Sequence, residues 1–197
     1  MGLFGTVYDG QIKNLHVSGS INVKDPSHDE VLHAGGVAGY FFGLGSIVNT
    51  TSSVDITISY EKHAVVAGGI AGYFSGRNFV NCSSSGDIQV TSGCAGVDVY
   101  IGGLIGHFYG NSYSPIVERC YSTGDITVNA NGGYTVGGIV GYTSVAQVKI
   151  SQCYSTCDIT TNAENYDRDG YIGVGGILGQ ANWGTNVSDC FTTGNLR

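Results

Sequence analysis

Proline, charged residues and long apolar runs are all scarce in this sequence. Only 2 of the 197 residues are proline, and only 12% are charged. The lack of proline and of a Gly-X-Y period excludes collagen. No stretch approaches the roughly 18 apolar residues of a transmembrane helix. Residues 1–5 lack the basic region and long apolar core of a signal peptide, so for an exported protein we expect the signal to lie outside this chain.

Basic residues are also few. Lys and Arg number 8 against 15 Asp and Glu, which gives a net charge of −7. This balance argues against nucleic acid and against anionic membrane surfaces as partners. The hydrophobic fraction of 42% argues against disorder, so we expect a single folded domain over residues 1–197.

Glycine, in contrast, is abundant, with 33 residues or about one in six. This is more than twice ordinary usage, and interior glycines oppose helix formation by about 1 kcal/mol each. The glycines recur in a pattern of Gly, two apolar residues and Gly, at intervals of 34, 33, 34, 35 and 38 residues. The six copies begin at Gly2, Gly36, Gly69, Gly103, Gly138 and Gly176.

A second block follows the glycines in each repeat. It reads apolar-x-polar-(Cys, Leu or Thr), then three residues, then Gly-Asp-Ile-x-Val or a variant, most clearly over 79–90, 117–128 and 150–161. Short segments that alternate polar and β-branched residues between Gly, Asn and Ser are typical of strands. The repeat therefore predicts an all-β fold, a parallel β-helix (β-solenoid) of about six coils with about 34 residues each. A right-handed coil is the default for parallel strands.

In register, these blocks resemble the GLUG-motif repeat. The segment Arg119-Cys120-Tyr121-Ser122-Thr123-Gly124-Asp125-Ile126 is close to the family pattern, and the resemblance covers nearly the whole chain. It implies a surface-exposed repeat module of a bacterial secreted or surface protein. Proteins with such repeats include immunoglobulin A1-specific zinc metallopeptidases and adhesin-like proteins. The peptidase activity is not implied, because the nearest approach to His-Glu-x-x-His is His28-Asp29-Glu30-Val31-Leu32-His33, with the wrong spacing.

Four cysteines occupy the same position in the last four repeats, where the first two repeats have Leu15 and Thr50. They are Cys82, Cys120, Cys153 and Cys190. Because the column accepts Leu and Thr, we interpret it as a packing position for buried thiols. Paired Cys-x-x-Cys spacing, which would favour a metal, is absent from the sequence.

Four aspartates form another column, Asp55, Asp87, Asp125 and Asp158. Asp87, Asp125 and Asp158 are weak candidates for a Ca²⁺ site built from adjacent coils. The favoured interpretation is turn chemistry, in which each carboxylate accepts backbone N–H groups, because Ser20 and Asn195 fill the same column. We therefore expect no cofactor, with Ca²⁺ as the alternative.

Aromatic residues form columns after the glycine motif and again at Tyr121, Tyr154 and Phe191. We expect these columns to stabilise the fold by packing. Recognition is assigned instead to Tyr113 and Trp183 in variable loops, and to Asp167 and Asp169, which resemble part of a calcium loop without its remaining ligands.

These observations predict a non-catalytic, surface-exposed repeat module that serves as a structural stalk or as an adhesion or binding segment. The expected location is extracellular or at the cell surface, with a host or surface protein or a glycan as partner. The alternative is a polysaccharide-acting lyase or hydrolase on the same scaffold. That alternative requires the Asp column to converge on a cleft near Arg119 or Lys149. The sequence also shows no polar cap at either end, so we expect a fragment of a longer chain or a domain that relies on neighbours.

Overall fold

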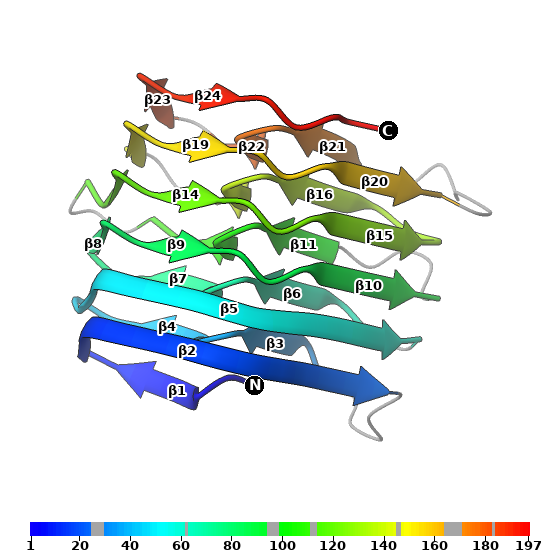
Figure 1. The fold of residues 1–197 in the computed structure, drawn as a ribbon, viewed down its shortest axis with the longest axis horizontal. Coiled ribbons are helices and arrows are strands. Elements are labelled where there is room, and N and C mark those ends of the chain that lie inside the picture. The colour runs from blue at the N-terminus through cyan, green and yellow to red at the C-terminus, as the bar shows by residue number, and fades with distance from the viewer. Residues whose placement is uncertain are drawn as a thin grey trace.

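The computed structural model describes residues 1–24, 30–61, 63–93, 99–110, 114–144, 147–163, 171–182 and 184–197. The predicted parallel β-solenoid is confirmed, with about five turns of about 35 residues (Figure 1). Within the described ranges every regular element is a strand, and none is a helix that could cross a membrane.

Each turn passes through three parallel sheets, which we call sheets A, B and C. Sheet A contains β1 (Phe4–Tyr8), β4 (Ala38–Phe42), β7 (Ala71–Ser75), β12 (Ile105–Phe108), β17 (Val140–Thr143) and β22 (Leu178–Ala181). Sheet C contains β3 (Leu32–Gly35), β6 (Val65–Gly68), β11 (Val99–Gly102), β16 (Tyr134–Gly137) and β21 (Ile172–Gly175). Sheets A and C lie behind the broad sheet B in Figure 1.

Sheet B begins with two long strands and continues with shorter ones. The long strands are β2 (Gln11–Lys24) and β5 (Ser46–Tyr60). In later turns the same path is divided into β8 (Asn78–Val80), β9 (Ser83–Ser84) and β10 (Ile88–Ser92); β13 (Ile116–Glu118), β14 (Tyr121–Ser122) and β15 (Ile126–Ala130); β18 (Lys149–Ser151), β19 (Tyr154–Ser155) and β20 (Ile159–Asn162); and β23 (Asn186–Ser188) and β24 (Phe191–Thr192). The short strands expected from the sequence are therefore found in the later turns, whereas β2 and β5 are long.

The strands pair in the register of the repeat. Ile88 pairs with Ile56 in the preceding turn and with Ile126 in the following one. Each column of the repeat is consequently a physical ladder, with a spacing of about 4.8 Å between rungs.

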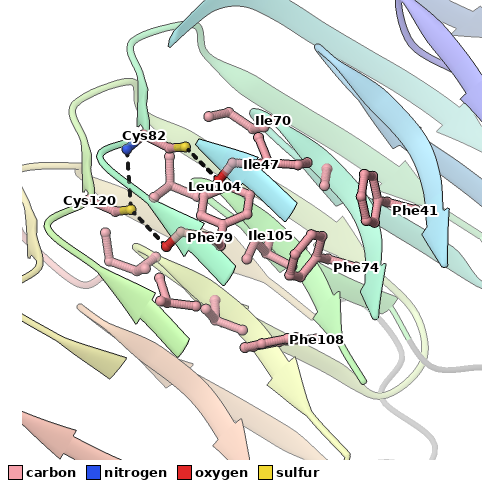
Figure 2. Close-up of a cluster of buried hydrophobic side chains, with 14 of the residues drawn as sticks. Phe41, Ile47, Ile70, Phe74, Phe79, Cys82, Leu104, Ile105, Phe108 and Cys120 are labelled. Atoms are coloured by element: carbon pink, nitrogen blue, oxygen red, sulfur yellow. Dashed lines mark hydrogen bonds between the residues drawn. The ribbon is translucent and has the colours of Figure 1, made fainter. Parts of the chain in front are cut away.

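The interior consists of two separate apolar lobes. The first lobe lies between sheet A and the start of sheet B, and Figure 2 shows part of it, with Phe41, Phe74 and Phe108 in one column. The second lobe lies between sheet C and the later part of sheet B, where Ile56, Ile88 and Ile126 are buried. The expected packing role of the phenylalanine column is confirmed, since all three side chains are fully buried.

A contact between glycine and serine columns separates the lobes, and we call it the waist. In the last five copies of the Gly-x-x-Gly motif, the first glycine meets a hydroxyl residue of sheet B. A Cβ atom built on Gly69 would lie 2.1 Å from Ser84 Oγ, and one built on Gly103 would lie 2.3 Å from Ser122 Oγ. The backbone can approach sheet B this closely only because glycine has no side chain. The same contact joins Gly36 to Ser52, Gly138 to Ser155 and Gly176 to Thr192.

A polar residue with positive φ bends the chain between the first and second segments of sheet B. The φ values of this column lie between 50° and 56°. Asn and Asp tolerate this conformation better than most other residues. The column consists of Asn14, Asn49, Asn81, Arg119, Gln152 and Asp189.

Candidate functional site

The four residues assigned to recognition from the sequence, Tyr113, Trp183, Asp167 and Asp169, lie outside the described residues. The same is true of His28, Asp29 and Cys94. The structure does place the Asp column, the Cys column and the aromatic columns, and these define which surfaces are open to a ligand.

The Asp column forms a hydrogen-bond ladder on the outer face of sheet B. The backbone N–H of Asp87 donates to Asp55 Oδ1 at 3.0 Å, and that of Asp125 donates to Asp87 Oδ1 at 2.9 Å. The N–H of Asp158 continues the ladder to Asp125 Oδ1 at 3.1 Å, and Asn195 closes it with two bonds to Asp158 Oδ1. The carboxylates accept backbone N–H groups, as the sequence favoured, but the donors belong to the next repeat and not to a local turn.

The Asn195 bonds stabilise the charged form of the last aspartate. The backbone N–H of Asn195, followed by its side-chain amide, lowers the pKa of Asp158 below its usual value. Asp55, Asp87 and Asp125 are exposed to solvent. Among the described residues, no group of three or more His, Cys, Asp or Glu side chains is arranged to hold a metal ion.

The basic residues near this column are directed elsewhere. Arg119 forms an ion pair with Glu118 at 2.6 Å and donates from Nε to Asn81 Oδ1 at 2.8 Å. Lys149 lies at the start of β18 on the exposed side of the strand. In the part of the chain that the structure describes, the carboxylates of the Asp column therefore lie on an open surface and not on the floor of a cleft.

The Cys column lies inside the first lobe, as the sequence predicts. Cys82, Cys120 and Cys153 are buried, and each thiol donates to a carbonyl of the preceding turn, such as Cys120 to Phe79 O at 3.5 Å (Figure 2). Burial raises the pKa of the Cys120 thiol well above its usual value. The five described cysteines, Cys157 and Cys190 included, are free thiols.

The outer faces of sheets A and C meet in a line of rings that we call the aromatic seam. It consists of His33 and Tyr100 from sheet C and Tyr40, Tyr73, His107 and Tyr142 from sheet A. Tyr40 and Tyr73 stack at 4.4 Å, and Tyr100 stacks on Tyr142 at 4.6 Å. The seam rings are half-buried, so they pack the two sheets together while leaving their outer edges in solvent.

Burial in the seam also favours the neutral form of both histidines. Desolvation, together with the nearby terminal ammonium, lowers the pKa of His33 to about 4. Desolvation, with a smaller contribution from His33, lowers the pKa of His107 to about 4. The Nε2 atom of His107 lies 2.7 Å from Ser144 Oγ.

An open cavity of about 490 Å³ lies where the seam reaches the first turn. Its lining residues are Met1, Gly5, Thr6, Glu30, Val31, Leu32, His33, Tyr40 and Tyr60. The Tyr60 hydroxyl donates to the carbonyl of Glu30 at 2.8 Å and holds one wall in place. Nearby, Tyr8 and Phe42 expose their rings, with centroids 5.6 Å apart. This combination of rings, a carboxylate and hydroxyl groups is the best candidate for a binding site in the described residues.

Sequence reasoning missed the cavity because its walls come from three different positions in the repeat. The aromatic columns were visible, but nothing in the repeat shows that sheets A and C meet on their outer faces. A weak signal was present in the half-apolar column of sheet C, in which His33 and Tyr100 alternate with Val66 and Thr135.

The fold and these columns define a three-sheet parallel β-solenoid whose polar ladders join its turns. No family model, curated protein or solved structure matches the chain.

Proposed function

We propose that the chain is a non-catalytic repeat module of the GLUG type, from a secreted or cell-surface bacterial protein. Its role is that of a structural or adhesion segment, and its binding site is the cavity at the first-turn end of the aromatic seam. The observation that supports this role is the use made of its polar side chains. The Asp, Asn and Cys columns bind neighbouring turns through hydrogen bonds, which leaves them in structural and not catalytic roles.

The cavity supports the adhesion part of the proposal. Tyr40 and the exposed rings of Tyr8 and Phe42 offer apolar faces and edges, while Glu30 and Thr6 offer polar groups around them. Aromatic surfaces with a few polar groups suit a saccharide, because a sugar ring has an apolar face and a rim of hydroxyl groups. The ligand class that we propose is therefore a glycan.

Affinity electrophoresis tests this assignment with mucin, before and after enzymatic deglycosylation, and with soluble polysaccharides as probes. Retardation by a glycosylated probe that is lost with Tyr40→Ala supports a glycan site at the cavity. Tyr121→Ala is the matched control, because Tyr121 is a stacked, exposed ring on the outer face of sheet B. Equal retardation by deglycosylated mucin would indicate a protein partner instead.

The same mixtures test the non-catalytic part of the proposal. The polysaccharide probes are assayed after incubation for new reducing ends and for unsaturated uronate products. We expect neither. Release of either product by the wild-type chain would support the polysaccharide-acting enzyme and overturn the proposal.

A further inference from the structure

A second cavity, which we call the polar notch, lies at the carboxyl ends of the strands of sheet B. Its volume is about 230 Å³, and it shares no lining residue with the cavity at the aromatic seam. It is built from successive turns, where β5, β10, β15 and β20 end on the right-hand side of Figure 1. Its polar lining includes Glu61, Thr91, Gly93, Asn129, Asn131 and Asn162.

Gly93 opens the notch because it has no side chain. Glu61, Gly93 and Asn131 are equivalent residues of three turns, since each directly follows the last paired residue of β5, β10 or β15. The three atoms nearest to a Cβ built on Gly93 all belong to Glu61, with Cγ at 3.3 Å, and the φ of Gly93 lies outside the left-handed region. The fold therefore does not require glycine here, as it does at the waist. The missing side chain leaves space between Glu61 and Asn131.

The notch contains one carboxylate and no basic group that neutralises it. Within the described part of the chain, Glu61 forms no hydrogen bond or ion pair. None of the residues that line the notch is Lys, Arg or His. The net charge of −7 adds to the attraction of this site for a cation. An ammonium group in the notch would form a charge-assisted hydrogen bond with the Glu61 carboxylate.

Three neutral side chains beside the carboxylate offer hydrogen bonds to hydroxyl groups. Asn162 Nδ2 donates to Asn129 Oδ1 at 2.9 Å, which leaves the Asn129 amide as a donor and Asn162 Oδ1 as an acceptor. Thr91 adds the hydroxyl group of an exposed residue. Donors and acceptors side by side match the neighbouring hydroxyl groups of a sugar, because each hydroxyl group both donates and accepts.

We propose that the polar notch binds an amino sugar, with the ammonium group on Glu61 and the ring hydroxyl groups on the neighbouring amides and Thr91. Gly93 provides the space for the ring. A divalent cation fits less well, because Glu61 is the only carboxylate that lines the notch and the described residues contain no group of three His, Cys, Asp or Glu that could hold a metal. The inference does not rest on the proposed glycan site at the aromatic seam.

NMR titration of the ¹⁵N-labelled 197-residue chain with D-glucosamine, in the presence of a chelator, tests the proposal. We expect saturable shifts of the backbone amides of Glu61, Gly93 and Asn131. D-glucose and N-acetyl-D-glucosamine lack the ammonium group and should bind about tenfold or more weakly. The absence of saturable shifts with glucosamine, or equal binding of glucose, overturns the proposal.

Cyclohexylamine tests the role of the hydroxyl groups. It has an ammonium group on a six-membered ring but no hydroxyl groups. It should therefore bind more weakly than glucosamine, because the amides of Asn129 and Asn162 and the Thr91 hydroxyl gain no partner from it. Equal binding of the two amines would show that the notch recognises any ammonium group, and the assignment to an amino sugar would be wrong.

Two notch variants and two controls locate the site. Glu61→Gln keeps the size of the side chain and should weaken glucosamine binding about tenfold or more by removing the charge. Gly93→Val fills the notch and should abolish binding. Both positions are exposed, so the fold should survive, which circular dichroism checks. Glu118→Gln removes a carboxylate of β13 outside the notch and should change nothing.

Tyr40→Ala is the second control, because Tyr40 lines the cavity at the seam and not the notch. Glucosamine binding that survives this variant separates the two sites, so that either proposal can fail without the other. Binding that is unchanged in Glu61→Gln and Gly93→Val, or that is lost equally in Glu118→Gln, would overturn the assignment to the notch.

Discussion

Gly103→Ala perturbs the waist at the centre of the solenoid. A Cβ at this position would lie 2.1 Å from the carbonyl oxygen of Gly138, 2.3 Å from Ser122 Oγ and 2.8 Å from Ser122 Cβ. Favourable contacts between carbon atoms lie at about 3.5–4.0 Å, so the alanine methyl group overlaps both a neighbouring turn and sheet B. The backbone has little room to move, because the Gly103 N–H donates to Gly137 O at 3.0 Å.

The expected magnitude follows from two opposing effects. Overpacking of this kind usually costs about 1–3 kcal/mol, and an obstacle made partly of backbone places Gly103→Ala near the upper end. The lower entropy of the unfolded chain returns about 0.4–1 kcal/mol. We therefore expect the free energy of unfolding to fall by about 2–2.6 kcal/mol.

Guanidinium denaturation followed by circular dichroism measures this change. Gly5→Ala is the matched control, because a Cβ on Gly5 meets no atom within 4 Å, and it should leave the stability within about 1 kcal/mol of the wild type. Adding Ser122→Ala to Gly103→Ala should restore only part of the loss, since the Gly138 carbonyl remains. A Gly103→Ala change below about 0.5 kcal/mol, or complete rescue by Ser122→Ala, would refute the assignment of the waist.

Three further predictions concern charge. Both seam histidines have folded pKa values of about 4, below the ordinary value of 6.5, so the stability that they contribute is complete above about pH 6.5 and is lost as the pH falls toward 4. The melting temperature should drop over that interval, and the double variant His33→Gln/His107→Gln should show a smaller drop. A variant with the same pH profile as the wild type would count against burial of the two rings. Asp125→Ala removes the acceptor for the Asp158 N–H and should cost about 1 kcal/mol, while Asp125→Asn keeps an acceptor oxygen and should cost less. A chelator should leave the wild-type melting temperature unchanged, and a fall on chelation would instead support Ca²⁺ at Asp87, Asp125 and Asp158.

The sequence was sufficient to predict the solenoid because its information is carried in columns. The glycine intervals predicted the turns of the solenoid, and the alternation in Gly-Asp-Ile-Thr-Val predicted strands. The mixture of Asp with Ser20 and Asn195 predicted carboxylates that accept backbone N–H groups, but not that these bonds join successive repeats. Each of these features depends on residues that are neighbours in the repeat or equivalent between repeats.

The features that were missed depend on contacts across the cross-section. The waist brings the column of Gly103 against the column of Ser122. The repeat pattern alone does not indicate that these two columns face each other. The cavity likewise needs the outer faces of two sheets to meet. The buried hydroxyl column of Ser52, Ser84, Ser122 and Ser155 was a usable signal, since a small polar residue kept within an apolar strand indicates a close backbone approach.

The waist has a consequence for how such a chain can vary. Glycine and serine keep the two lobes apart, so that among the described residues only Val17, in the first turn, packs against both of them. Energetic coupling between substitutions requires contact or a shared partner. Compensating changes should therefore run along the columns and within one lobe, so that covariation in an alignment of related sequences would divide the chain into two independent groups of positions.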